Sequence, residues 1–512
     1  MIFDSKDIGS GIPLNTDICI IGGGPAGIIL ALELAKASHE VILLESGGYN
    51  QEPDIKQLSV GENSGLPYYP VSENRYRALG GTTHLWAGWS RPLDPIDLKR
   101  RSWVNDSGWP ISYDELYSYY QKAHEYFSLS DFNFEPDYWS EKYRIPAAPF
   151  ITDPLELRIY QINKEVNFGQ NFSKDLSLTE NVQVILHATA TELLTEKRET
   201  NISCVVVLDR SKRKHIVRAK TYILACGGIE NARMLLLSGV NRRVGLGNVH
   251  DNAGRYFMEH VHFNSGAMCL EKQAGQSDLL FSPLSRPATC RIFLSEKFQH
   301  EQTLLNYNMS LEPVYLSQRE RDDMLFYRHS IPRPRQNNKW SQDRISEQFK
   351  SLIQRLRGRQ AGYSMAHTLE QIPNVNSRIY LSTEKDPLGQ FKACIHWDLT
   401  GQDRACYLRS RKTVIDKLTK AGIGRFIPDS VQDQKWPPDP LQGSRGHHMG
   451  TTRMNDDPRK GVVDKHCKVH GIENLFIAGS SVFPTSGSGT PTYTIAALAI
   501  RLADHLKSGI RN

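Results

Sequence analysis

The stretch Asp17-Ile-Cys-Ile-Ile-Gly-Gly-Gly-Pro-Ala-Gly-Ile-Ile-Leu-Ala-Leu-Glu-Leu-Ala-Lys36 decides the fold of this chain. Its first apolar run is typical of a buried parallel strand, and the apolar run after Pro25 is typical of a helix. Between the two runs, Gly22, Gly24 and Gly27 have the spacing G-x-G-x-x-G. We therefore expect a strand, a tight glycine turn and a helix in direct succession.

This unit predicts a dinucleotide-binding site. A second strand, Val41-Ile-Leu-Leu44, follows the helix, and Glu45 closes it. In such units the glycines allow a tight turn, close approach to a pyrophosphate and close packing of helix on strand, while the acid accepts a hydrogen bond from a ribose hydroxyl. The fingerprint alone does not choose between FAD and NAD. Its structural alternative is a glycine-rich turn that binds nothing.

Composition narrows the class of protein. The chain has 512 residues and a net charge of +6, which is slight for this length and does not favour nucleic acid as a partner. Residues 1–16 do not have the pattern of a signal peptide, and no run predicts a membrane span. The eight cysteines form no C-x-x-C pair. We interpret them as structural thiols in a reducing compartment and expect a cytoplasmic protein.

Two further glycine segments accompany the first. Residues 75–91 crowd glycines, hydroxyl side chains, a histidine and two tryptophans together, which suits close approach of backbone to a ligand. The alternative for this loop is a packed turn with buried aromatic side chains. The strand-like run Thr221-Tyr-Ile-Leu-Ala-Cys226 precedes Gly227 and an apolar helix. It predicts that the chain returns to the nucleotide-binding sheet, near the adenosine end of the ligand.

The middle of the chain contains no second fingerprint, and we assign it mainly to a substrate domain. Residues 341–356 have apolar side chains on one helical face among many basic ones. Such a helix docks on a membrane or an acidic partner, or packs on its own domain, and we favour packing.

The C-terminal part carries the sharpest chemical pattern. Gly446-His-His-Met-Gly-Thr-Thr-Arg-Met454 precedes a strand and the polar turn Pro484-Thr-Ser-Gly-Ser-Gly-Thr-Pro-Thr492, after which an amphipathic helix runs to the end. Thr490 suits the N-cap of that helix and Pro491 its first turn. The N-terminus of a helix favours an anion, and a reduced flavin carries one near its pyrimidine ring.

Together these motifs resemble the glucose–methanol–choline (GMC) oxidoreductases. The resemblance rests on the first glycine turn, Leu79-Gly-Gly-Thr-Thr83, Cys226-Gly-Gly-Ile-Glu-Asn231, Glu370-Gln-Ile-Pro-Asn-Val-Asn-Ser-Arg378 and the paired C-terminal segments. These motifs follow in order from about residue 17 to residue 506. The C-terminal pattern is most similar to the sugar-oxidising branch with pyranose oxidase and the flavin subunits of fructose and gluconate dehydrogenases.

The resemblance implies an α/β fold: a Rossmann-like FAD-binding domain of the para-hydroxybenzoate hydroxylase type and an α+β substrate domain built on a sheet. Residues 1–150, 175–256 and 441–512 are expected to form the FAD-binding domain, the last part with the catalytic segment. Residues 257–440 are expected to form the substrate domain.

The implied chemistry is oxidation of an alcohol to a carbonyl, with hydride leaving for flavin N5 while a base takes the hydroxyl proton. By alignment with the family, the base is His447, or His448 if the alignment shifts by one residue. A neutral imidazole, with a usual pKa of about 6.5, suits this proton transfer. The family's second catalytic residue is His or Asn, and its position here holds Thr490, which is either catalytic or only a helix cap. His260 is a candidate to assist.

The resemblance also implies a set of FAD contacts: Gly22, Gly24, Pro25, Ala26, Gly27, Glu45, Gly80, Gly81, Thr82, Thr83, Trp86, Ala188, Gly227, Gly479, Ser480, Thr490, Pro491 and Thr492. Pyranose oxidases link FAD to a histidine just before a tryptophan. Here Leu85 precedes Trp86 and His84 is one residue away, so we expect FAD to be bound without a covalent link. No metal site is expected.

The expected substrate is a sugar, a glycoside or another alcohol. The electron acceptor remains open between oxygen, a quinone and a carrier protein, and because the sequence has no C-x-x-C-H motif, any haem would belong to a separate chain. One rival is an FAD-containing lyase that uses the same histidine without net redox chemistry. An NAD-dependent enzyme is disfavoured by the early glycine loop and the C-terminal segments, and a pure binding module by the crowded His, Thr and Gly residues.

Overall fold

The computed structural model describes residues 1–9, 11, 13–145, 148, 151–163, 165–196, 200–239, 244–270, 287–314, 362–428, 436 and 446–509. The two expected strands around the glycine turn are confirmed as β2 (Leu14–Ile21) and β3 (Val41–Leu44), with α1 (Pro25–Ala35) between them. Pro25 occupies the first turn of α1, where its missing N–H has no intrahelical partner to lose.

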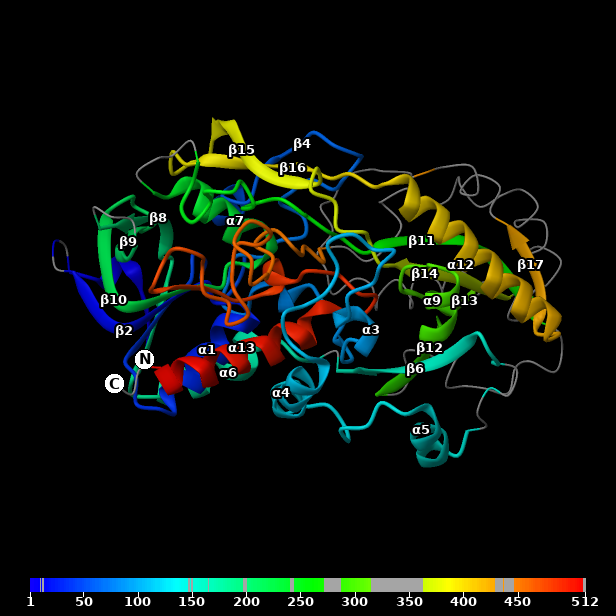
Figure 1. The fold of residues 1–512 in the computed structure, drawn as a ribbon. Coiled ribbons are helices and arrows are strands. Elements are labelled where there is room, and N and C mark those ends of the chain that lie inside the picture. The colour runs from blue at the N-terminus through cyan, green and yellow to red at the C-terminus, as the bar shows by residue number, and fades with distance from the viewer. Residues whose placement is uncertain are drawn as a thin grey trace.

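These strands lie inside a sheet of eight described strands (Figure 1). Its order is β1-β7-β3-β2-β10-β9-β8, and β18 also pairs with β10. The remaining members are β1 (Ile2–Asp4), β7 (Val182–Leu186), β8 (Thr189–Thr195), β9 (Ile202–Leu208), β10 (Lys214–Leu224) and β18 (Leu475–Ile477). Of these strands, β18 and the end of β10 coincide with runs expected to be strands from the sequence, whereas Ile2–Asp4 is too short a run to show a period.

Parallel pairing brings the chemically interesting turns to one edge of this sheet. Ile21 pairs with both Leu44 and Leu224, and Leu224 pairs with Ile477. Since the carboxyl ends of parallel strands meet at one edge, the segments that follow these four residues lie together.

Helices cover both sides of the sheet. α1 packs against α13 (Pro491–Gly509) and α6 (Phe168–Leu178), and α13 also packs against α4 (Tyr113–Tyr126). α7 (Gly227–Leu237) lies on the opposite side, next to β8 (Figure 1). The apolar side chains of α1 and α13 are almost entirely buried, which explains why both helices are apolar on nearly every turn.

A second, antiparallel sheet forms the other half of the molecule, in the order β17-β11-β14-β13-β12-β6-β5. Its strands are β5 (Trp89–Ser90), β6 (Leu155–Ile162), β11 (Val261–Leu270), β12 (Ala288–Leu294), β13 (Tyr307–Val314), β14 (Gly362–Leu369) and β17 (Gly424–Pro428). The long helix α12 (Gly401–Lys420) covers it (Figure 1). α12 begins at a capping box in which Thr400 and Asp403 bond each other's backbone amides.

A small third sheet has the order β15-β16-β4, from β15 (Arg378–Lys385), β16 (Phe391–His396) and β4 (Glu62–Asn63). β4 comes from the first hundred residues yet pairs with β16 of the expected substrate domain. β5 pairs with β6, which lies between the expected ranges 1–150 and 175–256 and joins the second sheet through β12. The strand β6 therefore lies in none of the expected ranges 1–150, 175–256, 257–440 and 441–512, and the two-residue strands β4 and β5 pair outside the range 1–150.

Short helices complete the described chain: η1 (Ser5–Asp7), α2 (Pro53–Gln57), η2 (Gly81–His84), α3 (Pro95–Leu98), α5 (Pro136–Tyr143), α9 (Glu296–Glu301) and η4 (Ser480–Val482). The expected basic helix at 341–356 lies outside the described residues. None of the described helices combines the length and apolar character that crossing a membrane requires. Seven of the eight cysteines have side chains that the structure describes, and all seven are free thiols.

Candidate active site

The first glycine turn is built so that two of its glycines are obligatory. Gly22 has φ of 112°, and a Cβ added there would lie 2.5 Å from the Ala225 carbonyl oxygen. A Cβ on Gly27 would lie 2.0 Å from the Gly22 carbonyl oxygen. By contrast, a Cβ on Gly24 would meet nothing within 4 Å. The turn therefore leaves open space in front of Gly24, at the start of α1.

A second glycine loop lies directly on this turn. The Gly80 amide donates a hydrogen bond of 2.7 Å to the Gly23 carbonyl, and a Cβ on Gly81 would lie 3.0 Å from the Gly24 Cα. No side chain caps the N-terminus of α1, so its first amides are available. Free amides at a helix start, facing open space between two glycine loops, fit a pyrophosphate.

Glu45 lies where the fingerprint expects an acid, at the end of β3. Its Oε2 accepts from the Gly23 amide at 2.9 Å, and its Oε1 accepts from the Gly47 amide at 2.8 Å and the Ser46 hydroxyl at 3.2 Å. A carboxylate has about four acceptor positions, so one remains on Oε2 for a ribose hydroxyl. The Ala188 amide donates to the Glu45 carbonyl at 2.8 Å, which places Ala188 beside this acid.

The later glycine turn joins both C-terminal segments. The Asn231 side chain accepts from the Cys226 amide at 2.8 Å and donates to the Ala478 carbonyl at 3.0 Å. The Ser480 hydroxyl donates to the His448 carbonyl at 2.6 Å. Gly227 has φ of 83° and Gly479 has φ of 114°, values that favour glycine. These contacts bring the predicted Gly227, Gly479 and Ser480 to the same edge as the first turn.

Thr83 and Trp86 of the early glycine loop are both held by hydrogen bonds to the protein itself. The Thr83 hydroxyl donates to the Gly80 carbonyl at 2.6 Å and accepts from the Phe168 amide, so it holds the loop. Thr82 is exposed. The Trp86 indole donates to the Val166 carbonyl at 2.7 Å, and its ring packs edge-on against Phe168. These contacts favour, for Trp86, the alternative of a packed turn with aromatic side chains.

Thr490 precedes α13, whose first residues are Pro491 and Thr492. Its hydroxyl donates to the Trp89 carbonyl at 2.7 Å and thereby ties the C-terminal turn to β5. The hydroxyl proton is therefore committed to the backbone. This leaves Thr490 able to accept a hydrogen bond but not to donate one to a substrate.

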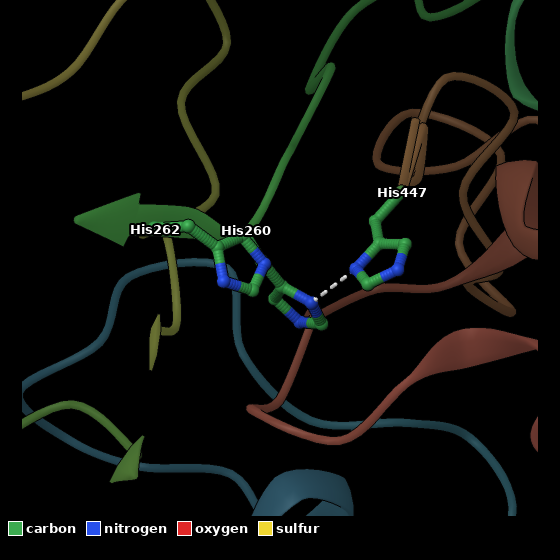
Figure 2. A group of neighbouring side chains, drawn as sticks. All are labelled: His260, His262 and His447. Carbon is green, nitrogen blue, oxygen red and sulfur yellow. Dashed lines mark hydrogen bonds between the residues drawn. The ribbon is translucent and has the colours of Figure 1, made fainter. Parts of the chain in front are cut away.

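His447 faces His260, which comes from the segment that leads into β11 (Figure 2). Met258 and Met449 form an antiparallel bridge with two backbone hydrogen bonds of 2.9 and 3.0 Å. His260 is two residues beyond one end of this bridge and His447 two residues before the other. Because side chains alternate along extended chains, both histidines project to the same side.

The two imidazoles are joined by a hydrogen bond of 2.8 Å between their Nδ1 atoms (Figure 2). His260 Nε2 lies 3.0 Å from the Gly487 carbonyl and 3.2 Å from the Ser486 carbonyl, so it carries the proton. In a neutral ring Nδ1 of His260 is then the acceptor, and His447 donates from its own Nδ1. In this arrangement, the ring nitrogen of the two histidines that keeps a free lone pair is Nε2 of His447.

Burial keeps these rings neutral. It lowers the pKa of His260 to about 4, because a charged imidazolium loses its hydration there. The pKa of His447 lies well below 6.5 through burial, and His260 and His448 when they carry a proton, and Arg291, act in the same direction. At neutral pH both rings are therefore uncharged.

Glu259 anchors the backbone of the pair. Its Oε1 accepts from the His260 amide at 3.0 Å and the His447 amide at 2.9 Å. Its Oε2 accepts from the Gly446 amide at 3.0 Å and the Tyr68 hydroxyl at 2.7 Å. Burial raises the pKa of Glu259 to about 7, although the four donors oppose this shift by favouring the carboxylate.

His262 completes a group of three histidines (Figure 2). One ring nitrogen from each of His260, His262 and His447 lies within 4.8 Å of the others, a spacing able to hold a metal ion. However, the Nδ1 atoms of His260 and His447 share a proton in the network above, and His262 Nδ1 lies 3.1 Å from the Thr368 hydroxyl. Hydrogen bonds therefore already engage one ring nitrogen of each of the three histidines.

His448 lies outside this group. Its ring packs against Phe257 and Tyr68, with centroids 5.8 and 6.3 Å away. Burial, and then the charge of Arg75, lower its pKa to about 3. The geometry favours His447 over His448 as the proton acceptor.

Sequence reasoning named His260 only as a possible helper and missed Glu259 and His262. The signal was the His-x-His spacing after Glu259, which predicts two imidazoles on one side of an extended segment. What the sequence does not give is the partner strand, because the bridge to Met449 joins segments far apart in the chain.

Comparison with known proteins adds independent findings. Two family models, both described as GMC oxidoreductase, match residues 169–260 and 373–499. The large subunit of fructose dehydrogenase from Gluconobacter japonicus is 25% identical, over 97% of this chain and 99% of its own length. The 6'''-hydroxyparomomycin C oxidase of Streptomyces lividus is 24% identical, over 96% of this chain and 92% of its own.

Among solved structures, the fold is similar to that of a pyridoxine 4-oxidase from Mesorbium loti. The TM-score is 0.56 at 16% sequence identity, and the alignment covers 96% of this chain and 99% of the other. At this identity the likeness concerns the fold alone.

Proposed function

The chain belongs to the GMC oxidoreductases, and we propose that it oxidises a secondary alcohol of a sugar or glycoside to a carbonyl, with His447 as general base. Membership of the family implies FAD as cofactor. The sugar assignment is supported by the relatives named fructose dehydrogenase large subunit and 6'''-hydroxyparomomycin C oxidase. The observation that carries the base is the hydrogen bond between His260 and His447, which leaves a lone pair on Nε2 of His447.

The residues of the predicted cofactor site fit FAD. Open space in front of Gly24, the free amides at the start of α1 and the remaining acceptor position on Glu45 suit a pyrophosphate and a ribose. We propose that Gly22–Gly27, Gly80, Gly81 and the later glycine turns hold the cofactor. When bound, FAD supplies the acceptor for the hydride that leaves the alcohol carbon.

The protein's own part is to move the hydroxyl proton. Nε2 of His447 accepts the proton while the C–H bond breaks, since the hydroxyl becomes strongly acidic as carbonyl character develops. His260 fixes the tautomer of His447 and accepts its Nδ1–H, so the growing positive charge meets a hydrogen-bond acceptor. Because burial disfavours the imidazolium, His447 then releases the proton readily.

We further propose that FAD is bound without a covalent link. His84 is held on both sides: Nε2 lies 2.9 Å from the Leu79 carbonyl, and Nδ1 lies 3.1 Å from Nδ2 of Asn167. Its ring also stacks on Tyr76 at 4.3 Å. These contacts commit both nitrogens to the protein. Acid precipitation of the purified protein should leave all flavin in the supernatant; flavin attached to the polypeptide by mass spectrometry would contradict this proposal.

The free thiols of the described cysteines support a cytoplasmic location, where such thiols stay reduced.

The test of the function is an anaerobic spectral titration of the purified protein with a panel of sugars, glycosides and simple alcohols. We expect loss of the oxidised-flavin absorption with at least one sugar or glycoside. A protein without flavin absorption would contradict the FAD assignment. Product formation while the flavin stays oxidised would instead support a lyase reaction with the same base. Mixing the reduced protein with oxygen, a quinone or a carrier protein then identifies the electron acceptor.

A further inference from the structure

We propose that the substrate is an acidic sugar or glycoside, whose negatively charged group binds Arg291 beside the catalytic histidines. This inference rests on the proposed function and narrows its substrate class. It comes from Arg291 in β12, whose described neighbours hold the guanidinium in place but include no carboxylate.

The Arg291 side chain is fixed in position. Its guanidinium carbon lies 4.6 Å from the ring centre of Trp89 and 5.2 Å from that of Tyr160, so the group stacks on aromatic faces. Nη1 donates to the Asn308 side-chain oxygen at 3.0 Å and lies 3.4 Å from the Thr368 hydroxyl. Both partners are neutral. They orient the guanidinium without cancelling its charge.

The other edge of the guanidinium has no partner. Nε is buried without a hydrogen bond, and Nη2 donates to no residue that the structure describes. Nε and Nη2 form the fork with which arginine binds a carboxylate or a phosphate through two parallel hydrogen bonds. A buried donor left unpaired costs free energy, so this edge is poised to gain from an anion.

Neighbouring arginines differ from Arg291 in that they pair with carboxylates, although their Nε atoms also lack a hydrogen-bond partner. Arg158 pairs with both Asp94 and Glu156, Arg91 pairs with Asp94, and Arg101 pairs with Glu370. Over the described parts of the chain, no carboxylate comes within ion-pair distance of Arg291. Arg291 is thus the member of this group whose counter-charge the protein does not provide.

Two hydroxyl groups near Arg291 are also unpartnered. Ile292 pairs with Met309, so Ser310 is the cross-strand neighbour of Arg291. Ser488 offers its carbonyl to the side chain of Asn308 at 2.9 Å, the residue that also holds Arg291. The hydroxyls of Ser310 and Ser488 are buried and make no hydrogen bond with the described residues. Buried polar atoms without partners point to a polar ligand.

This subsite borders the catalytic histidines on two sides. The Thr368 hydroxyl that contacts Arg291 also lies 3.1 Å from His262 Nδ1. Ser488 follows Gly487, whose carbonyl accepts the proton of His260 Nε2. A carboxylate or phosphate on Arg291 therefore belongs to the same molecule whose hydroxyl meets His447.

The test measures binding apart from turnover. FAD-loaded protein is first reduced anaerobically, so that it cannot oxidise a ligand, and is then titrated by calorimetry. The ligands are methyl β-D-glucuronide, methyl β-D-glucoside 6-phosphate and the neutral methyl β-D-glucoside. We expect an anionic glycoside to bind at least about 10-fold more tightly than the neutral one, and added salt to reduce the difference. Comparison of the two anions distinguishes carboxylate from phosphate.

Three variants test whether Arg291 causes the preference for an anionic glycoside. Arg291→Gln should weaken binding of the anion about 100-fold, the usual scale for losing a charge-assisted pair, and leave the neutral glycoside unchanged. Arg291→Lys should retain part of the preference, since it keeps the charge without the fork. Arg255→Gln removes an arginine that pairs with Asp251 and should change nothing. The FAD content should be equal in all three.

Equal binding of neutral and anionic glycosides by the unmodified protein, or no binding of either, would overturn the inference. So would an Arg291→Gln protein that keeps the preference or loses FAD. Anionic glycosides that reduce the oxidised flavin at the same rate with and without Arg291 would leave the proposed function standing and remove the anion subsite. Arg291-dependent binding with no flavin reduction would support the anion subsite and contradict the proposed function.

Discussion

The Nδ1 atoms of His260 and His447 lie 2.8 Å apart, although 187 residues separate the two histidines in the chain. Backbone carbonyls of the C-terminal turn hold the proton on His260 Nε2, so only one neutral arrangement satisfies the pair. In that arrangement Nε2 of His447 carries a lone pair. The pair thus presents a proton acceptor whose tautomer is set by the fold.

Replacing the base should abolish most of the chemistry. For His447→Ala we expect the rate of flavin reduction by substrate to fall about 10²- to 10⁴-fold, the usual contribution of a general base. FAD should remain bound at full stoichiometry, since the change removes no contact of the glycine turns. Anaerobic stopped-flow absorption measures the rate directly.

The neighbouring histidine is the matched control. His448→Ala removes a ring that packs against Phe257 and Tyr68, away from the pair, so flavin reduction should slow much less than in His447→Ala. If the His448 variant is the slower of the two at equal FAD content, the base has been assigned to the wrong residue.

His260 should act as a positioning residue. In His260→Ala, Nδ1 of His447 loses its acceptor and the ring is free to adopt the other tautomer. We expect flavin reduction to slow about 10- to 100-fold with little change in substrate affinity. Added imidazole, bound in the space left by the ring, should restore part of the rate. A loss that no imidazole concentration reverses, together with a lowered melting temperature, would indicate a purely structural role.

Part of this site was predictable from the sequence because its signals are local. The strands β2 and β3, the glycine turn and α1 follow from periodicity and spacing within 30 or so residues. The segment with His447 and His448 stood out through its crowding of histidine, glycine and threonine. Each of these patterns is complete within one stretch of chain.

The remainder depends on contacts that no local pattern encodes. The bridge between Met258 and Met449 brings His260 to face His447. The two-residue strands β4 and β5 are too short for any period to show, yet β5 places Trp89 under Arg291. Side-chain roles of this kind follow from the pairing of strands that are far apart in the chain, which a single sequence does not specify.

Glu259 should give the reaction a pH dependence. Its pKa is raised to about 7 in the folded protein, so the carboxylate predominates above that pH and the acid below it. Four donors require the carboxylate, and a proton on Glu259 would release the amides of Gly446 and His447. We therefore expect the rate of flavin reduction to fall partly as the pH decreases through about 7. A complete loss should follow only well below pH 6.5, where His447 itself takes a proton.

The variant Glu259→Gln distinguishes the decrease in rate near pH 7 from the decrease at lower pH. The amide cannot ionise and presents an N–H₂ group to donors, so the rate at high pH should fall about 10-fold and the step near pH 7 should disappear. Tyr68→Phe removes one donor only and should keep both steps, with the first shifted to higher pH. A step near pH 7 that persists in Glu259→Gln would assign it to another group.

A substitution in the first glycine turn should change FAD binding without changing the stability of the fold. A Cβ on Gly24 meets nothing within 4 Å, so Gly24→Ala should leave the melting temperature of the flavin-free protein nearly unchanged. The same methyl group fills the space proposed for the pyrophosphate, and we expect the Kd for FAD to rise at least about 100-fold. Fluorescence titration of the flavin-free protein with FAD measures this Kd.

Two other glycines provide the comparison. In Gly27→Ala the added Cβ would lie 2.0 Å from the Gly22 carbonyl oxygen, so the turn must distort and the melting temperature itself should fall. In Gly401→Ala the Cβ again meets nothing within 4 Å, but the site is at the start of α12, and both quantities should match the unmodified protein. If Gly24→Ala binds FAD as tightly as Gly401→Ala does, the pyrophosphate does not lie against the turn at Gly24, and the cofactor must approach α1 from another side.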